Sequence, residues 1–130
     1  MAVAATYPEP LARRFVDFLG GGGIEVTGLA PASIMTATEA GRLTDDETVA
    51  MIAAGDRPDA EAVLVPDTAL RTASVLPRLA REVGKPVLTA NQVTVWEAAR
   101  LAGLGPDLGL GQFLAGDLVS SGADRYGAGR

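Results

Sequence analysis

The stretch 61–91 constrains the fold of this chain most, because its pattern changes from strand to helix and back to strand. Residues 62–65 form a short apolar run stopped by a proline, which is typical of a strand buried on both faces of a sheet. Helical spacing of apolar residues predicts a helix over 72–83, on the positions Leu76, Leu79, Ala80 and Val83. Residues 86–89 form a second short apolar run. Two short parallel strands joined by a helix are therefore predicted.

Polar residues follow both of these strands. Asp67 and Thr68 come directly after the first strand, and Asn91 comes after the second. The carboxyl ends of parallel strands meet at one edge of a sheet, where open α/β folds usually bind their ligands. We therefore expect these three side chains to lie at a binding edge.

The rest of the chain repeats the alternation of strand and helix. Strands are predicted over 2–6 and 24–29, a long connection over 30–43, and a last helix from Asn91 to about Ala102. The helix between the first two strands carries its apolar face on Leu11, Phe15, Phe18 and Leu19, and the last helix carries its own on Val95, Ala98, Ala99 and Ala102.

Strands that alternate with helices in this order imply a parallel sheet covered on both faces. The predicted fold is α/β, a small Rossmann-like or flavodoxin-like three-layer sandwich around a four-stranded parallel sheet. Residues 1–114 are expected to form this single domain, and the Gly-rich polar residues 115–130 a tail. A chain of 130 residues, 48% of them hydrophobic, is long enough to bury such a core.

Two local patterns resemble ligand sites but have a simpler explanation. The four glycines at 20–23 follow a helix and open a strand, whereas a phosphate-binding loop follows a strand and opens a helix. These glycines are predicted to end the helix and form a turn. The carboxylates at 45–47 follow Thr44 with the spacing of a capping box, which favours a helix start over a metal or acid-base site. Trp96 is expected in a core or an interface rather than stacked on a ligand.

The residue types that are absent limit the chemistry. The chain has no cysteine, which excludes disulfides, thiolate metal sites and a cysteine nucleophile, and it has no histidine. Acid-base chemistry must therefore rest on Asp, Glu, Lys, Tyr or a positioned water. A net charge of −5 without a basic cluster argues against nucleic acid, and no apolar run approaches the ~20 residues that span a bilayer. We expect a cytoplasmic protein with no nucleic-acid or membrane partner.

A family resemblance is carried by the central stretch, AVLVPDTALRTASVLPRLAREVGKPVLTANQVTVWEAARLAGL. It resembles the second lobe of the aspartate/glutamate racemase superfamily, in its maleate isomerase and arylmalonate decarboxylase branch. Two other segments are similar to the segments that open and close this lobe, namely ATYPEPLARRFVDFLGGGGIEV, with Tyr7 at the position of the family's tyrosine, and GLGQFL at 109–114. The resemblance covers residues from about Ala4 to Leu114.

The resemblance implies an enzyme that works without a metal or an organic cofactor, with its active site between two similar lobes. Members contribute one cysteine from each lobe, and this chain has Asp67 where the cysteine of the second lobe would stand. The chain also has about half the length that two lobes need. The resemblance therefore implies a homodimer of this lobe or a separate partner lobe, unless the chain is an excised or engineered fragment.

Asp67 is the expected acid-base residue. An aspartate is a poor substitute for a thiolate that adds to a double bond, but it can still move protons. The alternative is that Asp67 caps the turn that follows it. The first reading implies proton transfer at carbon on a small carboxylic or dicarbonyl compound, by isomerisation, racemisation, decarboxylation or a related lyase or cyclisation step. The second fits a degenerate lobe that binds a small acid or supports a partner subunit.

The remaining candidates would bind the substrate. Thr68, the amide of Ala69 and Asn91 resemble the carboxylate-binding groups of the family, although Thr68 and Asn91 also suit loop and helix capping. Arg71 is either a substrate-binding residue or an ion-pair partner of Asp67. Tyr7 is expected to donate to a substrate oxygen, or else to be an amphipathic residue at the rim.

Overall fold

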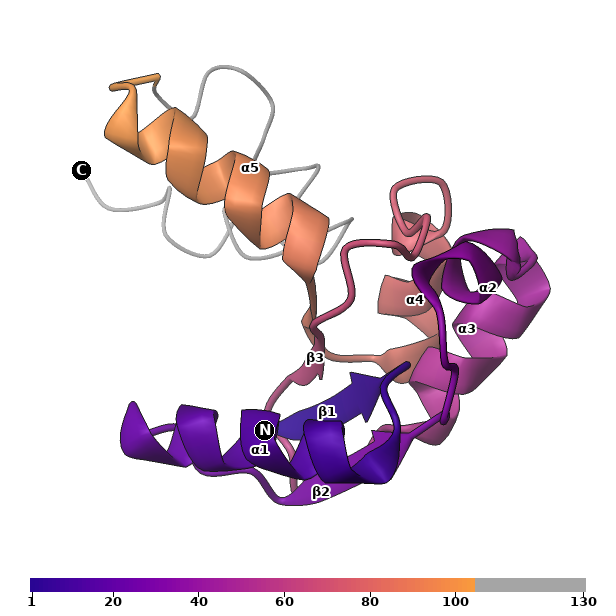
Figure 1. Ribbon diagram of the computed structural model, residues 1–130. Helices are drawn as coiled ribbons and strands as arrows, with labels where there is room; N and C mark the ends of the chain where they lie inside the picture. The colour runs from indigo at the N-terminus through magenta and orange to yellow at the C-terminus, as the bar shows by residue number, and fades with distance from the viewer. Residues whose placement is uncertain (105–130) are drawn as a thin grey trace.

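The computed structural model describes residues 1–104 of the chain. Four strands and five helices follow one another in this part, with two helices between the second and third strands (Figure 1). In chain order they are β1 (Ala2–Ala5), α1 (Glu9–Gly21), β2 (Gly28–Pro31), α2 (Ala37–Arg42), α3 (Asp45–Ala54), β3 (Val63–Val65), α4 (Leu76–Val83), β4 (Val87–Thr89) and α5 (Ala90–Leu101). The 109–114 segment and the predicted tail 115–130 lie outside the described residues.

The four strands form one parallel sheet in the order β2-β1-β3-β4. Its register aligns Val3 of β1 with Leu64 of β3, and Leu64 with Leu88 of β4. Each connection between successive strands passes through at least one helix, so the carboxyl ends of all four strands lie at one edge. The predicted α/β fold with a four-stranded parallel sheet is confirmed.

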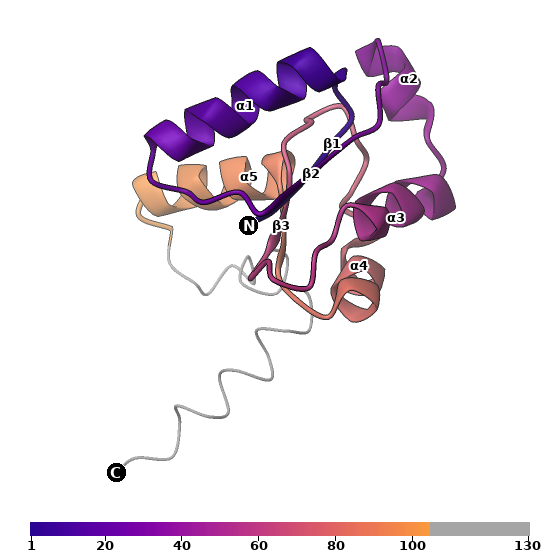
Figure 2. The same cartoon turned by 90° about the horizontal axis from the view of Figure 1, so that it is seen from below.

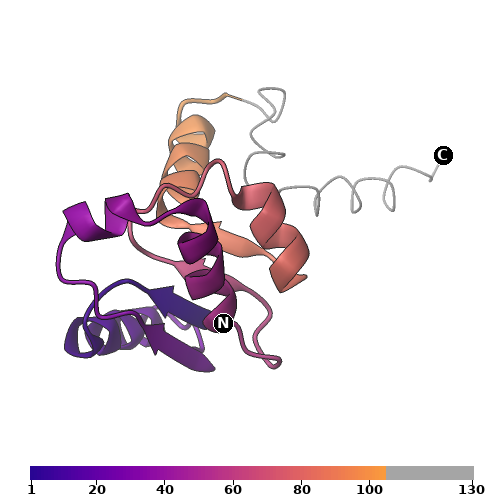
Figure 3. The same ribbon diagram turned by 90° about the vertical axis from the view of Figure 1, so that its right-hand side faces the viewer.

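The two faces of the sheet are covered unequally. Figure 2 shows α2, α3 and α4 on one face and α1 and α5 on the other. The first face buries a large apolar cluster that includes Ile52, Val63, Val65 and Leu79. The buried cluster on the second face consists of Val3, Ala5, Ala12 and Leu19. Figure 3 shows α1 and α5 toward opposite edges of the sheet, so the strands between them are less covered on this face.

The region around β2 differs from the prediction. β2 spans 28–31 rather than 24–29, because the short strand β1 sets the register and pairs along its whole length with Gly28–Pro31. The connection predicted over 30–43 contains the helix α2. This helix begins with a capping box, in which the Glu39 N–H donates to the Thr36 hydroxyl at 3.1 Å.

The helix predicted over 72–83 is also shorter than expected. α4 begins at Leu76, and Pro77 occupies its first turn. Proline lacks an N–H and clashes with the preceding turn, so it fits only at the start of a helix. Residues 72–75 are therefore left to the loop that follows β3.

The predicted apolar faces of α1 and α5 are only partly buried. Leu11 and Phe18 of α1 are exposed, because this helix contacts the sheet through Ala12 and Leu19. Of the face predicted for α5, Ala99 alone is buried within the described residues. Both helices therefore present apolar side chains that the sheet does not cover.

The local predictions about helix ends are confirmed. α1 ends at Gly21, and Gly23 adopts a φ of 80°, so the glycine run ends the helix and forms a turn. The Thr44 N–H donates to Glu47 Oε2 at 2.8 Å and the Glu47 N–H donates to the Thr44 hydroxyl at 3.3 Å, which is the predicted capping box. Within residues 1–104, no group of three or more carboxylates is placed to hold a metal ion. No helix of this part is long and apolar enough to cross a membrane.

Candidate functional site

Asp67 stands just beyond β3, an inner strand of the sheet. Its Oδ1 accepts a hydrogen bond from the backbone N–H of Ala69 at 2.7 Å, and its Oδ2 accepts one from the hydroxyl of Thr6. The first bond closes a tight turn of the kind that aspartate favours. The second ties the loop after β3 to the end of β1. Both carboxylate oxygens are thus held in the capping geometry that the sequence left open as an alternative.

Thr6 is a site residue that the sequence analysis missed. It is buried at the end of β1, where its hydroxyl reaches Asp67. A threonine that closes an apolar strand is a possible signal, because a buried hydroxyl needs a hydrogen-bond partner. Its partner lies 61 residues away in the sequence, so the pairing becomes visible only in the fold.

Tyr7 lies next to the same carboxylate. Its hydroxyl donates to the carbonyl of Pro66 at 3.0 Å, and its ring packs against the small apolar cluster under α1. Burial raises the pKa of Tyr7 above its ordinary value of 10.0, and the negative charge of Asp67 raises this pKa further. Tyr7 therefore keeps its proton at neutral pH and serves as a hydrogen-bond donor.

The loop 66–75, between β3 and α4, frames a cavity of about 370 Å³ at the carboxyl edge of the sheet. Asn91 Nδ2 donates to the carbonyl of Thr68 at 3.0 Å, and the hydroxyl of Thr72 donates to that of Thr89 at 3.2 Å. These two bonds fix the loop to the end of β4 and the start of α5. The cavity is lined by residues 68–74 together with Asn91 and Gln92.

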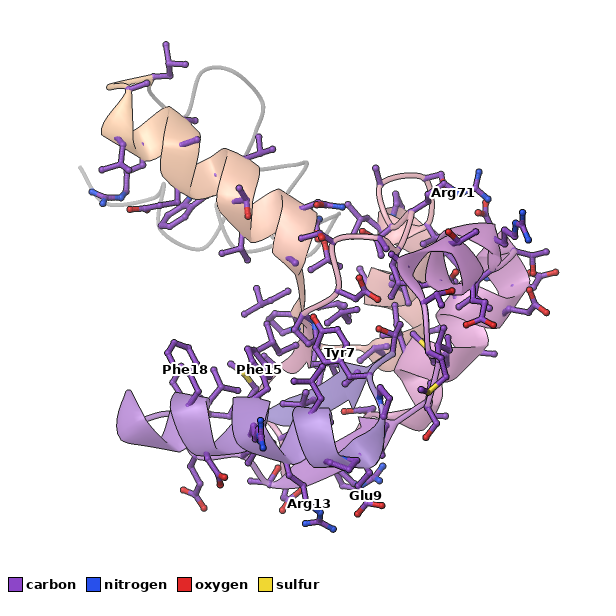
Figure 4. The ribbon with its side chains drawn as sticks, viewed as in Figure 1. Tyr7, Glu9, Arg13, Phe15, Phe18 and Arg71 are labelled. Carbon is purple, nitrogen blue, oxygen red and sulfur yellow. The ribbon has the colours of Figure 1, made fainter. Side chains whose placement is uncertain are left out.

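All the predicted substrate-binding residues line this cavity, namely Thr68, Ala69, Arg71 and Asn91. The amide of Ala69 already donates to Asp67, and Asn91 already holds the loop. Arg71 is exposed and forms no ion pair within residues 1–104, so the hypothetical pair with Asp67 is absent. Figure 4 shows Arg71 at the loop, well away from Tyr7. Its guanidinium is available to an anion that enters the cavity.

The predicted residues therefore form two adjoining groups. The first comprises Asp67 and Tyr7 with the added Thr6, between the ends of β1 and β3. The second is the cavity of the 66–75 loop, and the bond from the Ala69 N–H to Asp67 joins the two. A fixed carboxylate beside a cavity with an unpaired cation can bind a small acid and exchange a proton with it.

Comparison with known proteins places the chain in a family. Residues 1–114 match the family model described as arylmalonate decarboxylase. The chain belongs to the arylmalonate decarboxylase family. The arylmalonate decarboxylase of Bordetella bronchiseptica is 30% identical to it over 108 residues, which are 81% of this chain and 45% of that protein.

Solved structures agree with this family assignment. A doubly substituted arylmalonate decarboxylase in a liganded form superposes with a TM-score of 0.75 at 26% identity, over 80% of this chain and 45% of that chain. A maleate cis-trans isomerase mutant of Nocardia farcinica, with a covalently bound succinylcysteine intermediate, shares the fold at a TM-score of 0.73 and 22% identity, over 79% of this chain and 42% of that chain. The chain spans less than half the length of each of these relatives.

Proposed function

We propose that this chain forms one half of a cofactor-independent enzyme that transfers a proton at a carbon atom of a small carboxylic or dicarbonyl compound. The observation that carries the proposal is the Asp67 carboxylate, which Thr6 and the Ala69 amide fix beside the cavity of the 66–75 loop. Family membership supports the same reaction class, because the relatives are a decarboxylase and an isomerase. Racemisation and lyase or cyclisation steps use the same proton transfer.

Each candidate residue has a chemical role in this proposal. Arg71 pairs with a substrate carboxylate at the cavity, and the hydroxyl of Thr68 donates to it. Asn91 orients both groups by holding the loop in place. Tyr7 gives up its hydrogen bond to the Pro66 carbonyl and donates instead to a substrate oxygen that gains negative charge during the reaction. Asp67 takes a proton from the reacting carbon or returns one to it.

The decarboxylation of an arylmalonate illustrates the proposed step, with the proton and the electron pair accounted for. The bond between the α carbon and one carboxylate breaks, and carbon dioxide leaves. The electron pair stays with the α carbon and is shared with the remaining carboxylate as an enediolate, which hydrogen-bond donors such as Tyr7 stabilise. Asp67 in its acid form then delivers a proton to the carbon and recovers one from water.

Cis-trans isomerisation of maleate is not expected. The Nocardia farcinica relative carries a succinylcysteine intermediate, in which the sulfur of a cysteine is bonded to the substrate carbon. This chain contains no cysteine, and a carboxylate is a much weaker nucleophile toward carbon than a thiolate. Turnover of an arylmalonate without turnover of maleate would therefore indicate proton transfer rather than thiolate addition.

The other half of the site is proposed to come from a second lobe. The matched part of this chain corresponds to 45% of the Bordetella bronchiseptica protein, so that protein has more residues outside the match than inside it. Either a second copy of this chain or a separate partner lobe supplies the facing groups. The carboxyl edge of the described sheet then forms one wall of the cleft.

A non-catalytic function is the competing proposal. Both oxygens of Asp67 accept hydrogen bonds from the chain itself, which is what a capping aspartate does. In this case Arg71 and Thr68 bind a small acid that is not converted. Binding without turnover would distinguish this function from the first.

The decisive experiment is the conversion of phenylmalonate in D₂O by the full chain, followed by NMR. The enzyme hypothesis predicts phenylacetate that carries one deuterium at the α carbon, while maleate stays unchanged. Asp67→Asn is expected to lower the rate by at least about 100-fold, because a positioned acid-base group contributes about 10²–10⁴ in rate.

Asp45→Asn is the matched control. It makes the same chemical change at an exposed position in the first turn of α3, outside the residues that line the cavity, and it should keep the rate of the unsubstituted chain. Full activity of Asp67→Asn would refute the acid-base role. Shifts of the Thr68 and Asn91 resonances on adding phenylmalonate, without any product, would establish the binding function instead.

A further inference from the structure

Two hydrogen bonds attach the cavity loop to the rest of the fold on either side of Arg71. The carbonyl of Thr68 accepts from Asn91 Nδ2 at 3.0 Å. The hydroxyl of Thr72 donates to that of Thr89 at 3.2 Å. Thr89 ends β4 and Asn91 lies in the first turn of α5, so both bonds reach the same junction of strand and helix. The backbone of Arg71 is therefore held from both sides.

The bond from Thr72 belongs to a buried chain of three side chains. Thr72, Thr89 and Gln92 are each at most 3% exposed. The side-chain oxygen of Gln92 accepts from the Thr89 hydroxyl, and it also accepts from the Thr89 N–H at 3.3 Å. The single hydrogen of the Thr89 hydroxyl is thus committed to Gln92, so toward Thr72 its oxygen can only accept. Thr72 is the donor that this buried oxygen requires.

Arg71 depends on this support, because its side chain has none of its own. It is exposed at the rim of the cavity and forms no ion pair within residues 1–104. Figure 4 shows it on the loop. Any backbone that must be ordered when a ligand binds lowers the affinity by the entropy of ordering. A loop that is already fixed avoids this loss.

We propose that Thr72 is a positioning residue for the binding of a carboxylate at Arg71. Its hydroxyl is buried and bonded to Thr89, so it acts through the backbone of the loop and not by touching the ligand. The proposal deepens the function proposed above and rests on the anion site at Arg71.

The acid-base group does not depend on Thr72. Asp67 accepts from the Thr6 hydroxyl and from the Ala69 amide, and neither bond passes through Thr72. Loss of the Thr72 hydroxyl should therefore weaken the binding of the substrate and leave the chemical step unchanged. A residue that only stabilised the fold would not separate these two effects.

Thr72→Val tests the proposal, because it removes the hydroxyl and keeps the branched shape of the side chain. NMR titration of the full chain with phenylmalonate should give a dissociation constant raised about 5–10-fold, roughly the effect of one lost hydrogen bond. If phenylmalonate is converted, KM should rise by the same factor with kcat unchanged. Thr72→Ser keeps the hydroxyl and should bind within about twofold of the unsubstituted chain. Thr72→Ala removes the hydroxyl without a new methyl contact, and circular dichroism verifies that each variant folds.

The same substitution in an Arg71→Gln background tests whether Thr72 acts through Arg71. There Thr72→Val should change the dissociation constant by less than about twofold, because the side chain that it positions is gone. Thr48→Val is the matched control. It makes the same change at a threonine of α3 that is 2% exposed and does not line the cavity, and it should leave the dissociation constant unchanged.

This proposal and the proposed function fail separately. Binding that Thr72→Val weakens, without any turnover, would refute the enzyme and leave the role of Thr72 standing. Turnover with an unchanged KM in Thr72→Val would overturn the role of Thr72 alone, and so would an equal loss of affinity with and without Arg71. Absence of binding to the unsubstituted chain at about 10 mM phenylmalonate would overturn it as well.

Discussion

Thr6→Val tests the bond that connects the ends of β1 and β3. The substitution removes the hydroxyl that donates to Asp67 Oδ2 and keeps the branched shape of the side chain. Thr6 is only 1% exposed, so its packing should change little, and the principal loss is one hydrogen bond to a carboxylate. The Oδ2 atom of Asp67 loses this hydrogen bond and then has to be solvated by water at the edge of the sheet.

The expected loss of unfolding free energy is about 1.5 kcal/mol. Hydrogen bonds to charged groups contribute about 1.5–3 kcal/mol, and the lower end applies because Asp67 is only half-buried and water partly replaces the hydroxyl. With about 2.1 cal/mol/K of unfolding entropy per residue, the loss corresponds to a decrease in Tm of roughly 5–7 °C for a domain of this size. Thr6→Ser retains the hydroxyl and removes one methyl group, which costs about 1 kcal/mol by itself.

A double-mutant cycle separates the bond from the packing. Urea unfolding, followed by circular dichroism, would be measured for Thr6→Val, Asp67→Ala and the double variant. We expect a coupling energy of about 1.5 kcal/mol for this pair, and near zero when Thr6→Ser replaces Thr6→Val in a hydroxyl-retaining control. A coupling energy below about 0.5 kcal/mol for Thr6→Val would show that Thr6 does not hold Asp67 in solution.

Two further predictions concern titration. The first uses a Tyr126→Phe background, in which Tyr7 is the remaining tyrosine, and ultraviolet absorbance should then give a pKa of Tyr7 above 10.0. Adding Asp67→Asn should lower this pKa but leave it above 10.0, because burial is the larger cause of the shift. An unchanged pKa in Asp67→Asn would contradict the proximity of the two groups. The second concerns Glu47, whose pKa is lowered by its hydrogen bonds with Thr44. Because the folded-state pKa lies below 4.5, the charged form stabilises α3 above that pH, and the stabilisation disappears as the pH falls through the lowered pKa. Glu47→Gln should therefore be less stable than the unsubstituted chain at pH 7 and equally stable at pH 2, as measured by urea unfolding.

The elements that were predicted correctly depend on residues close together in the chain. The capping box of α3 needs Thr44 and Glu47 at a spacing of three, and the glycine run needs a helix before it, so both follow from the local sequence. Pro77 also marks the start of α4, although the helical spacing around it favoured a longer helix. The position of β2 could not be predicted this way, because its partner β1 determines which residues pair.

The candidate site was likewise predictable only in part. The positions of Asp67 and Asn91 at strand ends follow from the order of strands and helices. The partners of these residues do not follow, because each partner comes from a segment remote in sequence, as Thr68 does for Asn91. The exposure of Arg71, without an ion pair to Asp67, is likewise a property of the folded 66–75 loop.

By itself, the sequence determined a parallel α/β domain with polar residues at the carboxyl edge of its sheet. It also limited the available chemistry, because it contains no cysteine and no histidine. Apolar runs and helical spacing are local patterns, and hydrophobic burial turns them into layers. Only the tertiary structure decided that Thr6 and Ala69 hold Asp67 and that the 66–75 loop frames a cavity. These features arise where strands and helices far apart in the chain meet, and their geometry depends on the order and register of the whole sheet.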